Sequence, residues 1–281
     1  MNKFLTIAGN LVRSFWKDPV VFSHALNQLP AMCDAFRYIK EYSEPPRGAA
    51  TVYATPEPNP LWDYFQNNKV GPGIWKREHY FEAYNRHLGK FVGKKVNLLE
   101  IGVFSGGSLK MWRTYLGGQS HIYGMDIEPA CKSYESDRIS VLIGDQSNRD
   151  MWKSFRENVG EIDILIDDGG HTVEQQRTSL EEMLPFLRPG GVYICEDIHG
   201  DHNKFASFSA CLVHGLNRVG TPSPPFQSSV FSVHFYPYLL VIEKHAAPVL
   251  DLPSCRNGTE WQPFFDWMKD APGKVGPSVW G

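Results

Sequence analysis

Acidic residues and a histidine gather in two short motifs of this chain. The first is Asp167-Asp168-Gly169-Gly170-His171, and the second is Glu196-Asp197. Carboxylates that lie close together repel one another unless a cation lies among them, and oxygen ligands favour Mg²⁺, Ca²⁺ or Mn²⁺ over zinc. An imidazole titrates near neutral pH, so His171 is suited to removing a proton from a hydroxyl. We therefore predict a divalent cation among these acids and a general base at His171. The alternative for His171 is a structural role, as a capping or core histidine.

A second group of residues forms a glycine-rich segment, Glu100-Ile101-Gly102-Val103-Phe104-Ser105-Gly106-Gly107-Ser108. Gly102 permits a tight turn, and Gly106 and Gly107 allow a backbone to approach a ligand closely. A glycine-rich turn is by itself a weak signal. The carboxylate of Glu100 indicates which kind of ligand this segment would bind, because a carboxylate would repel a pyrophosphate and would accept a cationic group of a ligand.

Further acids follow the next two apolar runs of the chain. Asp126 ends the first of these runs, at the place where a carboxylate often binds the two hydroxyls of a ribose. Asp145, with Gln146 beside it, follows the second run and is placed to receive the amine of an adenine. Each acid alone is equally well explained as a helix cap or a solvated turn. Together with Glu100 they favour a nucleotide-type ligand that carries a positive charge.

Short apolar runs alternate with amphipathic stretches between residues 96 and 196, which predicts strands joined by helices and hence a parallel sheet. The carboxyl ends of parallel strands meet at one edge of a sheet, so the acidic motifs are expected to converge there. Two later runs flank Tyr236-Pro237-Tyr238 and predict a hairpin with one antiparallel strand. The expected strands are 96–101, 121–126, 139–143, 162–167, 192–196, 230–235 and 239–243, and the expected helices are 75–88, 108–116, 150–159 and 173–187.

The two ends of the chain differ from this central part. Residues 1–43 read as helices broken at Pro19 and Pro30, and residues 44–60 are rich in proline. We therefore expect a helical arm and linker at 1–60, a cofactor-binding domain at 61–245 and an irregular tail at 246–281. Apolar residues recur at helical spacing in the arm, which favours packing on the body of the protein or on a second copy of the chain over a membrane surface.

The bulk composition excludes several classes of partner. The chain has 281 residues and a net charge of −3, so it lacks the basic balance that nucleic-acid binding requires. Its five cysteines form no Cys-x-x-Cys pair, which argues against a disulfide framework and a zinc site and favours a cytoplasmic location. No apolar run approaches about 18 residues, so no membrane span is expected.

With these residues identified, the chain resembles the class I S-adenosylmethionine-dependent methyltransferases. More narrowly, it is similar to the metal-dependent macrocin O-methyltransferase group and its cephalosporin-hydroxylase-like relatives. The resemblance extends from about Asn68 to Lys244. The stretches that carry it are Tyr80-x-x-x-Tyr84, 100–112, 123–127, 144–147, 166–171, 189–197 and 232–236.

The resemblance implies a doubly wound, mostly parallel α/β sheet of seven strands, to which the residue patterns described above add a C-terminal antiparallel hairpin and a helical N-terminal extension. It implies Mg²⁺, or another hard divalent cation, held by Asp168 and Asp197 with Glu196 as an addition. It implies catalysis by His171 with Asp168, on a hydroxyl of a sugar or glycosylated small molecule. The residues that it implies as contacts of S-adenosylmethionine are Glu100, Gly102, Ser105, Gly106, Ser108, Asp126, Ile127, Asp145, Gln146 and Asp167.

The chain departs from the family at Phe104, where many methyltransferases have glycine. Two rival hypotheses remain open at this point. A dinucleotide-dependent oxidoreductase shares the fold class, although it leaves Glu100 and the acidic motifs unexplained. A non-catalytic cofactor-binding subunit would instead use the aromatic N-terminal arm as its working surface, in the oligomer that we expect the arm to form.

Overall fold

The computed structural model forms two compact units, Met1–Val52 and Tyr53–Gly281. The predicted proline-rich linker and C-terminal tail lie largely outside the residues that the structure describes. Within the described residues, no helix is long and apolar enough to cross a membrane. The structure describes residues 2–42, 58–200, 204–219, 222–253, 255 and 257–258.

The first unit consists of helices α1 (Asn2–Lys17) and α2 (Pro19–Glu41). The side chain of Asp18 accepts hydrogen bonds from the first backbone N–H groups of α2, which confirms the predicted break at Pro19. The predicted break at Pro30 is wrong, because α2 continues through this residue. Proline removes a single backbone donor, and the other hydrogen bonds of this 23-residue helix keep it continuous.

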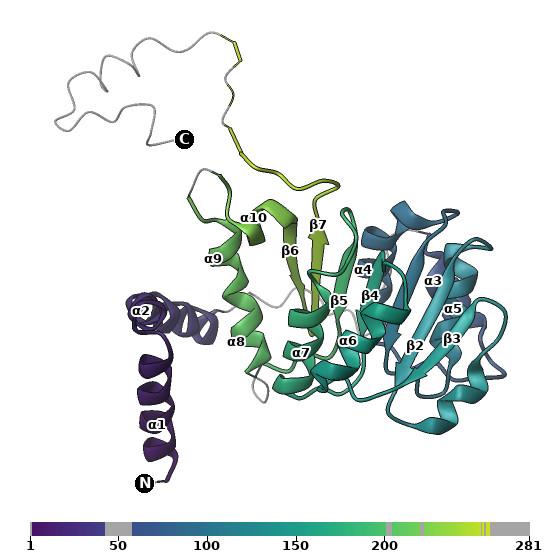
Figure 1. Ribbon diagram of the computed structural model, residues 1–281, viewed down its shortest axis with the longest axis horizontal. Coiled ribbons are helices and arrows are strands. Elements are labelled where there is room, and N and C mark those ends of the chain that lie inside the picture. The colour runs from purple at the N-terminus through teal and green to yellow at the C-terminus, as the bar shows by residue number, and fades with distance from the viewer. Residues whose placement is uncertain are drawn as a thin grey trace. The chain divides into compact units, whose positions relative to one another are not determined.

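The second unit is built on one seven-stranded sheet with the order β3-β2-β1-β4-β5-β7-β6 (Figure 1). The first five strands in this order, from β3 to β5, are parallel to one another. Strand β7 is antiparallel to both β5 and β6, so the predicted hairpin is confirmed. The strands are β1 (Asn97–Ile101), β2 (His121–Asp126), β3 (Ile139–Ile143), β4 (Ile164–Asp167), β5 (Val192–Cys195), β6 (Val230–Tyr236) and β7 (Leu239–Lys244).

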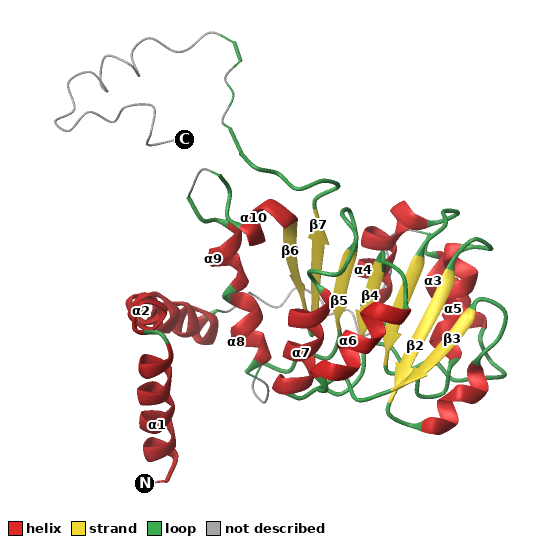
Figure 2. Cartoon of the chain, in the orientation of Figure 1, coloured by secondary structure: helices red, strands yellow, loops and turns green. Residues whose placement is uncertain are grey.

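Helices cover both faces of this sheet (Figure 2). One hydrophobic cluster packs α3, α4 and α5 against the strands, and a second packs α6, α7 and α8 against the opposite face. Strands β4 and β5 are buried along their whole length, which explains their continuous apolar sequences. The helices of this unit are α3 (Pro60–Asn67), α4 (Tyr80–Leu88), α5 (Gly107–Leu116), α6 (Arg149–Asn158), α7 (Val173–Met183), α8 (Phe205–Ala210), α9 (Leu212–Leu216) and α10 (Pro225–Ser229), with 3₁₀ turns at Gly89–Phe91 and Pro129–Tyr134.

The helix predicted at 75–88 begins only at Tyr80. Residues 75–79 instead cross the carboxyl edge of the sheet, where Lys76 forms ion pairs and Arg77 bonds Asp197. Tertiary contacts therefore override the local helical preference of these residues. The predicted helix at 173–187 ends early, at Met183, and the remaining predicted elements differ from the structure by at most two residues at either end.

Candidate active site

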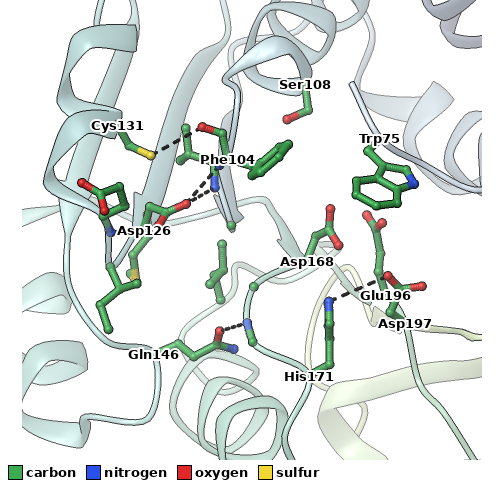
Figure 3. Close-up of a pocket in the computed structure, with 18 of the residues that line it drawn as sticks. Trp75, Phe104, Ser108, Asp126, Cys131, Gln146, Asp168, His171, Glu196 and Asp197 are labelled. Atoms are coloured by element: carbon green, nitrogen blue, oxygen red, sulfur yellow. Dashed lines mark hydrogen bonds and ion pairs between the residues drawn. The ribbon is translucent and has the colours of Figure 1, made fainter. Parts of the chain in front are cut away.

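A cavity of about 1010 Å³ opens at the carboxyl ends of the parallel strands (Figure 3). Ten of the predicted site residues line it: Gly102, Ser108, Asp126, Ile127, Asp145, Gln146, Asp168, His171, Glu196 and Asp197. Four others, Glu100, Ser105, Gly106 and Asp167, are not among the residues that line it. The sequence therefore predicts the location of the cavity, although some of its residues support the wall from behind.

The glycine-rich loop between β1 and α5 is shaped by close packing. Gly102 has φ +89°, and a Cβ placed on it would lie 2.1 Å from the carbonyl oxygen of Asp168. A Cβ on Gly106 would lie 2.5 Å from the ring of Tyr134, and one on Gly107 would lie 2.4 Å from the carbonyl oxygen of Gly73. The chain itself therefore fills the space beside these three glycines, whether or not a ligand is bound.

Asp126 fixes the path of this loop through its carboxylate. One oxygen accepts the backbone N–H groups of Val103 and Phe104, at 2.8 and 3.0 Å, and the other accepts that of Glu128 at 3.0 Å. Burial alone would raise the pKa of Asp126, but these three donors outweigh it and hold the pKa below its usual value. The residue is thus an anion at neutral pH, and it lines the cavity.

Lys76 was not identified from the sequence, yet its ammonium lies at the centre of the site. The Nζ atom lies 2.6 Å from Asp168, 3.0 Å from Glu196 and 3.2 Å from Glu100, and the side chain is 2% exposed. Burial alone would lower the pKa of Lys76, but the three carboxylates outweigh it and raise the pKa well above its usual value. No sequence signal separates this lysine from the exposed lysines of the chain.

Glu100 and Glu196 are buried behind this ammonium. The hydroxyl of Ser108 donates to Glu100 at 2.6 Å, and the hydroxyl of Tyr84 donates to Glu196 at 2.6 Å. Burial raises the pKa of Glu100 and, together with the charge of Asp168, raises that of Glu196 well above its usual value. These two acids are therefore held by partners within the protein before any ligand enters.

Asp168, His171 and Asp197 form an open cluster at the same edge of the cavity. Each offers one ligand atom, and these atoms all lie within 4.8 Å of one another. The Nε2 atom of His171 lies 3.8 Å from a carboxylate oxygen of Asp197, and a dashed line in Figure 3 marks this pair. Asp197 has φ +51° and accepts hydrogen bonds from Arg77 and Tyr80, which outweigh its burial and keep its pKa below the usual value.

Gln146 and Asp167 support the loop that carries His171. The amide of Gln146 donates to Asp167 at 3.0 Å, and its oxygen accepts the backbone N–H of Gly170 at 2.6 Å. Burial raises the pKa of Asp167 to about 7. Asp145 accepts hydrogen bonds from the backbone and hydroxyl of Ser147, both at 2.8 Å, and so also shapes its own turn. The predicted contacts of these residues with a cofactor stay predictions.

A second histidine cluster lies outside the cavity. His87, His234 and Glu243 offer ligand atoms within 4.8 Å of one another. Glu243 already pairs with Lys90 at 2.8 Å and with His87, whose other ring nitrogen pairs with the hydroxyl of Tyr236. This network joins α4 to β6 and β7, and we assign it a structural role.

With this geometry established, residues 99–198 match the family described as Methyltransferase domain. This chain carries a methyltransferase domain. The family resemblance that the sequence motifs indicate is thereby confirmed, and the edge of the sheet that holds the acidic cluster belongs to this domain.

Relatives of known function share a longer part of the chain. The chain is 36% identical to the 8-demethyl-8-(2-methoxy-alpha-L-rhamnosyl)-tetracenomycin-C 3'-O-methyltransferase of Streptomyces olivaceus, over 69% of this chain and 53% of that protein. It is 35% identical to the demethylmacrocin O-methyltransferase of Streptomyces fradiae, over 53% of this chain and 38% of that protein. The chain spans about half the length, or less, of the curated relatives it matches.

The fold of the methyltransferase domain also matches solved structures. MycE methyltransferase from the mycinamycin biosynthetic pathway, in complex with Mg, SAH and mycinamycin VI, gives a TM-score of 0.59 at 24% identity, over 68% of this chain and 54% of that chain. A crystal form of MycE with Mg and SAH gives 0.58 at 25% identity, over 67% and 55%. The predicted Rossmann-like methyltransferase fold is therefore confirmed.

Trp75 and Phe104 are two aromatic residues of this cavity that face solvent. The side chain of Trp75 is 84% exposed and that of Phe104 is 71% exposed, and both line the cavity. Figure 3 shows the Trp75 ring above the acidic cluster and the Phe104 ring beside the glycine-rich loop. Large rings left in water at the mouth of a cavity offer surfaces for stacking on a bound molecule.

Proposed function

We propose that this protein is an S-adenosylmethionine-dependent, Mg²⁺-assisted O-methyltransferase that acts on a sugar hydroxyl of a glycosylated small molecule. The observation that carries the proposal is the open cluster of Asp168, His171 and Asp197 beside the glycine-rich loop of a methyltransferase domain. Relatives named as O-methyltransferases of a rhamnosyl tetracenomycin, of demethylmacrocin and of mycinamicin VI support the acceptor class.

The cavity fits the cofactor in size and in the kinds of groups that line it. Its volume of about 1010 Å³ lies at the upper end of the range for small-molecule sites, which leaves space for a cofactor and part of an acceptor. The anionic Asp126 lines the cavity, where its carboxylate would bind ribose hydroxyls. The cofactor would supply a methyl group on a cationic sulfur, and the surplus of carboxylates in this site favours a cationic ligand.

The acidic cluster also fits a hard divalent cation. Glu100, Asp168, Glu196 and Asp197 bring four carboxylates together, whereas Lys76 and Arg77 are the cations that pair with them. Asp168 and Asp197 face the cavity with His171, and Glu196 lines it from a buried position. We propose Asp168, Asp197 and Glu196 as the ligands of Mg²⁺, which would stabilise the negative charge that develops on the acceptor oxygen.

The remaining chemistry belongs to residues of this chain. His171 would take the proton of the acceptor hydroxyl on a ring nitrogen while the oxygen bonds to the methyl carbon and the carbon–sulfur bond breaks, which would leave the electron pair on the sulfur of the departing thioether. Asp197, 3.8 Å from that ring, would stabilise the imidazolium, and Arg77 and Tyr80 hold Asp197 in position. The loop that carries His171 is fixed by the bond from Gly170 to Gln146.

Calorimetry and a transfer assay test this proposal. The full chain should bind S-adenosylhomocysteine and should transfer a labelled methyl group to a glycosylated macrolide panel. EDTA should abolish transfer, and added Mg²⁺ should restore it. Tight binding of NAD without binding of S-adenosylhomocysteine would overturn the proposal in favour of an oxidoreductase. Transfer that persists after exhaustive chelation would remove the metal from the mechanism.

The N-terminal helices carry a separate proposal about assembly. Phe15, Trp16 and Phe36 are exposed large apolar side chains in α1 and α2, and α2 buries none of its residues. We propose that these helices join copies of the chain into a homo-oligomer. Light scattering on the full chain and on a variant with Phe15→Ser and Trp16→Ser tests this, because the proposal requires the variant to have a lower mass.

A further inference from the structure

We propose that Lys76 is a positioning residue that holds the acids of the cofactor side and of the metal side together, and that it competes with the divalent cation for Asp168 and Glu196. The inference rests on the proposed function, because it takes these two acids as metal ligands. It adds a residue that lies outside residues 99–198, the part that matches the methyltransferase family.

The position of Lys76 is fixed by the segment that carries it. On the preceding side, the carbonyl groups of Pro72 and Gly73 lie directly against Gly107, where a Cβ would be 2.5 and 2.4 Å away. On the following side, Arg77 bonds Asp197 at 3.0 Å and a ring nitrogen of His79 lies 2.8 Å from the carbonyl oxygen of Pro237. The ammonium therefore enters the site from a segment that is anchored at both ends.

The three acids that Lys76 contacts come from three neighbouring strands. Glu100 lies on β1, Asp168 follows β4 and Glu196 follows β5, and these strands are adjacent in the sheet. A single ammonium thus connects the acid next to the glycine-rich loop with two acids of the metal site. Charges that are buried without a partner are costly, so Lys76 stabilises this arrangement when no ligand is bound.

The same ammonium opposes a divalent cation. The contact between Nζ and Asp168 is the shortest of the three, at 2.6 Å, and Asp168 has the most exposed side chain of the three acids. A cation bound by Asp168 and Glu196 would lie within a few ångströms of Nζ, where like charges repel strongly in a site with little water. Removing the ammonium should therefore tighten Mg²⁺ binding about tenfold or more.

Titration of Mg²⁺ into the metal-free full chain, followed by calorimetry, tests the inference. Lys76→Met should bind Mg²⁺ at least about tenfold more tightly than the wild type. Lys90→Met is the matched control, because Lys90 also pairs with a glutamate, at 2.8 Å, but outside the cavity. Its affinity for Mg²⁺ should equal that of the wild type.

Two further variants keep the test decisive if Lys76→Met fails to fold. Glu100→Gln removes one carboxylate and leaves the ammonium, so it should weaken Mg²⁺ binding. The double variant of Lys76→Met with Glu100→Gln has the net charge of the wild type and keeps Asp168 and Glu196, so it should bind more tightly than the wild type. The double variant separates competition by Lys76 from a general change in charge, because a general change in charge predicts wild-type affinity for it.

Each outcome bears on a different claim. Wild-type or weaker Mg²⁺ affinity in both Lys76→Met and the double variant would overturn the inference and leave Lys76 a purely structural role. If the wild type and all variants bind S-adenosylhomocysteine but not Mg²⁺, the metal part of the proposed function fails and the inference fails with it. Loss of S-adenosylhomocysteine binding in the wild type would refute the proposed function itself.

Discussion

Replacement of Gly102 by alanine should damage the cofactor loop and the metal site together. Gly102 has φ +89°, and its added Cβ would lie 2.1 Å from the backbone carbonyl oxygen of Asp168. A backbone atom cannot rotate away as the end of a side chain can. The loop that begins at Asp168 must therefore move, and this loop carries both a proposed metal ligand and His171.

The expected loss of folding stability has two parts, backbone strain and overpacking, and two other glycines allow each part to be measured alone. A left-handed conformation costs an L residue about 1–2 kcal/mol, and overpacking against a fixed neighbour costs about 1–3 kcal/mol. Gly93 has φ +76° with nothing within 4 Å, so Gly93→Ala isolates the first part. Gly191 is crowded by the backbone carbonyl oxygens of Arg188 and Asp163, both at 2.8 Å, without a positive φ, so Gly191→Ala isolates the second. Gly102→Ala should cost about the sum, about 2–5 kcal/mol.

Urea unfolding of the three variants and the wild type measures these free energies under one set of conditions. Replacing glycine by alanine reduces the conformational entropy of the unfolded chain, which stabilises the protein. This contribution is common to all three variants and cancels when they are compared. Gly102→Ala should also weaken Mg²⁺ binding, whereas Gly93→Ala should leave it unchanged. If Gly102→Ala were no less stable than Gly93→Ala, the close packing of the loop against Asp168 would be refuted.

Three further substitutions test separate parts of the site. His171→Gln should lower the transfer rate about 10²-fold or more and leave the affinity for S-adenosylhomocysteine unchanged, so a rate close to wild type would exclude His171 as the base. Trp75→Ala should raise the KM for the acceptor several-fold while the KM for the cofactor stays constant, and the reverse pattern would place the ring on the cofactor. Backbone donors hold the pKa of Asp126 below its usual value, so its contribution to stability is present at neutral pH and is lost as the pH falls below about 4. Asp126→Asn should lack this acid-side loss in unfolding measured against pH, and an unchanged pH profile would contradict the assignment.

Much of the sheet could be predicted because its strands are short, apolar and separated by helices. The predicted strands at 121–126 and 139–143 have the bounds of β2 and β3. Parallel strands must place their carboxyl ends at one edge, so the convergence of Asp126, Asp168 and Asp197 followed from the order of the elements alone.

The segment before α4 could not be predicted in the same way. Local periodicity favours a helix from Trp75, yet the first helical residue is Tyr80. What decides the conformation of residues 75–79 is a set of contacts with Glu100, Asp168 and Asp197, which are distant in the sequence. The residues that flank Lys76 in the sequence do not indicate that it pairs with three acids.

The structure accounts for the backbone at Phe104, which departs from the family in sequence. Phe104 has φ +47°, in the region where glycine is favoured, so the glycine of many methyltransferases suits this position. Here the strain is offset because Asp126 accepts the N–H groups of both Val103 and Phe104. Hydrogen bonds to a charged acceptor contribute about 1.5–3 kcal/mol each, which exceeds the cost of about 1–2 kcal/mol for the left-handed residue.

The acids of the site form a buried set and an exposed set, and the two sets are suited to different roles. Glu100 and Glu196 are buried and paired with Lys76, whereas Asp168 and Asp197 are partly exposed and face the cavity with His171. The buried acids keep a lysine charged at the centre of the site, and that lysine orients the more exposed Asp168. An acceptor hydroxyl would approach from the cavity, so in the proposed function proton transfer belongs to the exposed set, and metal binding to that set together with Glu196. In the inference drawn above, the buried set would set the strength of cation binding through Lys76, which Glu100 and Glu196 hold beside Asp168.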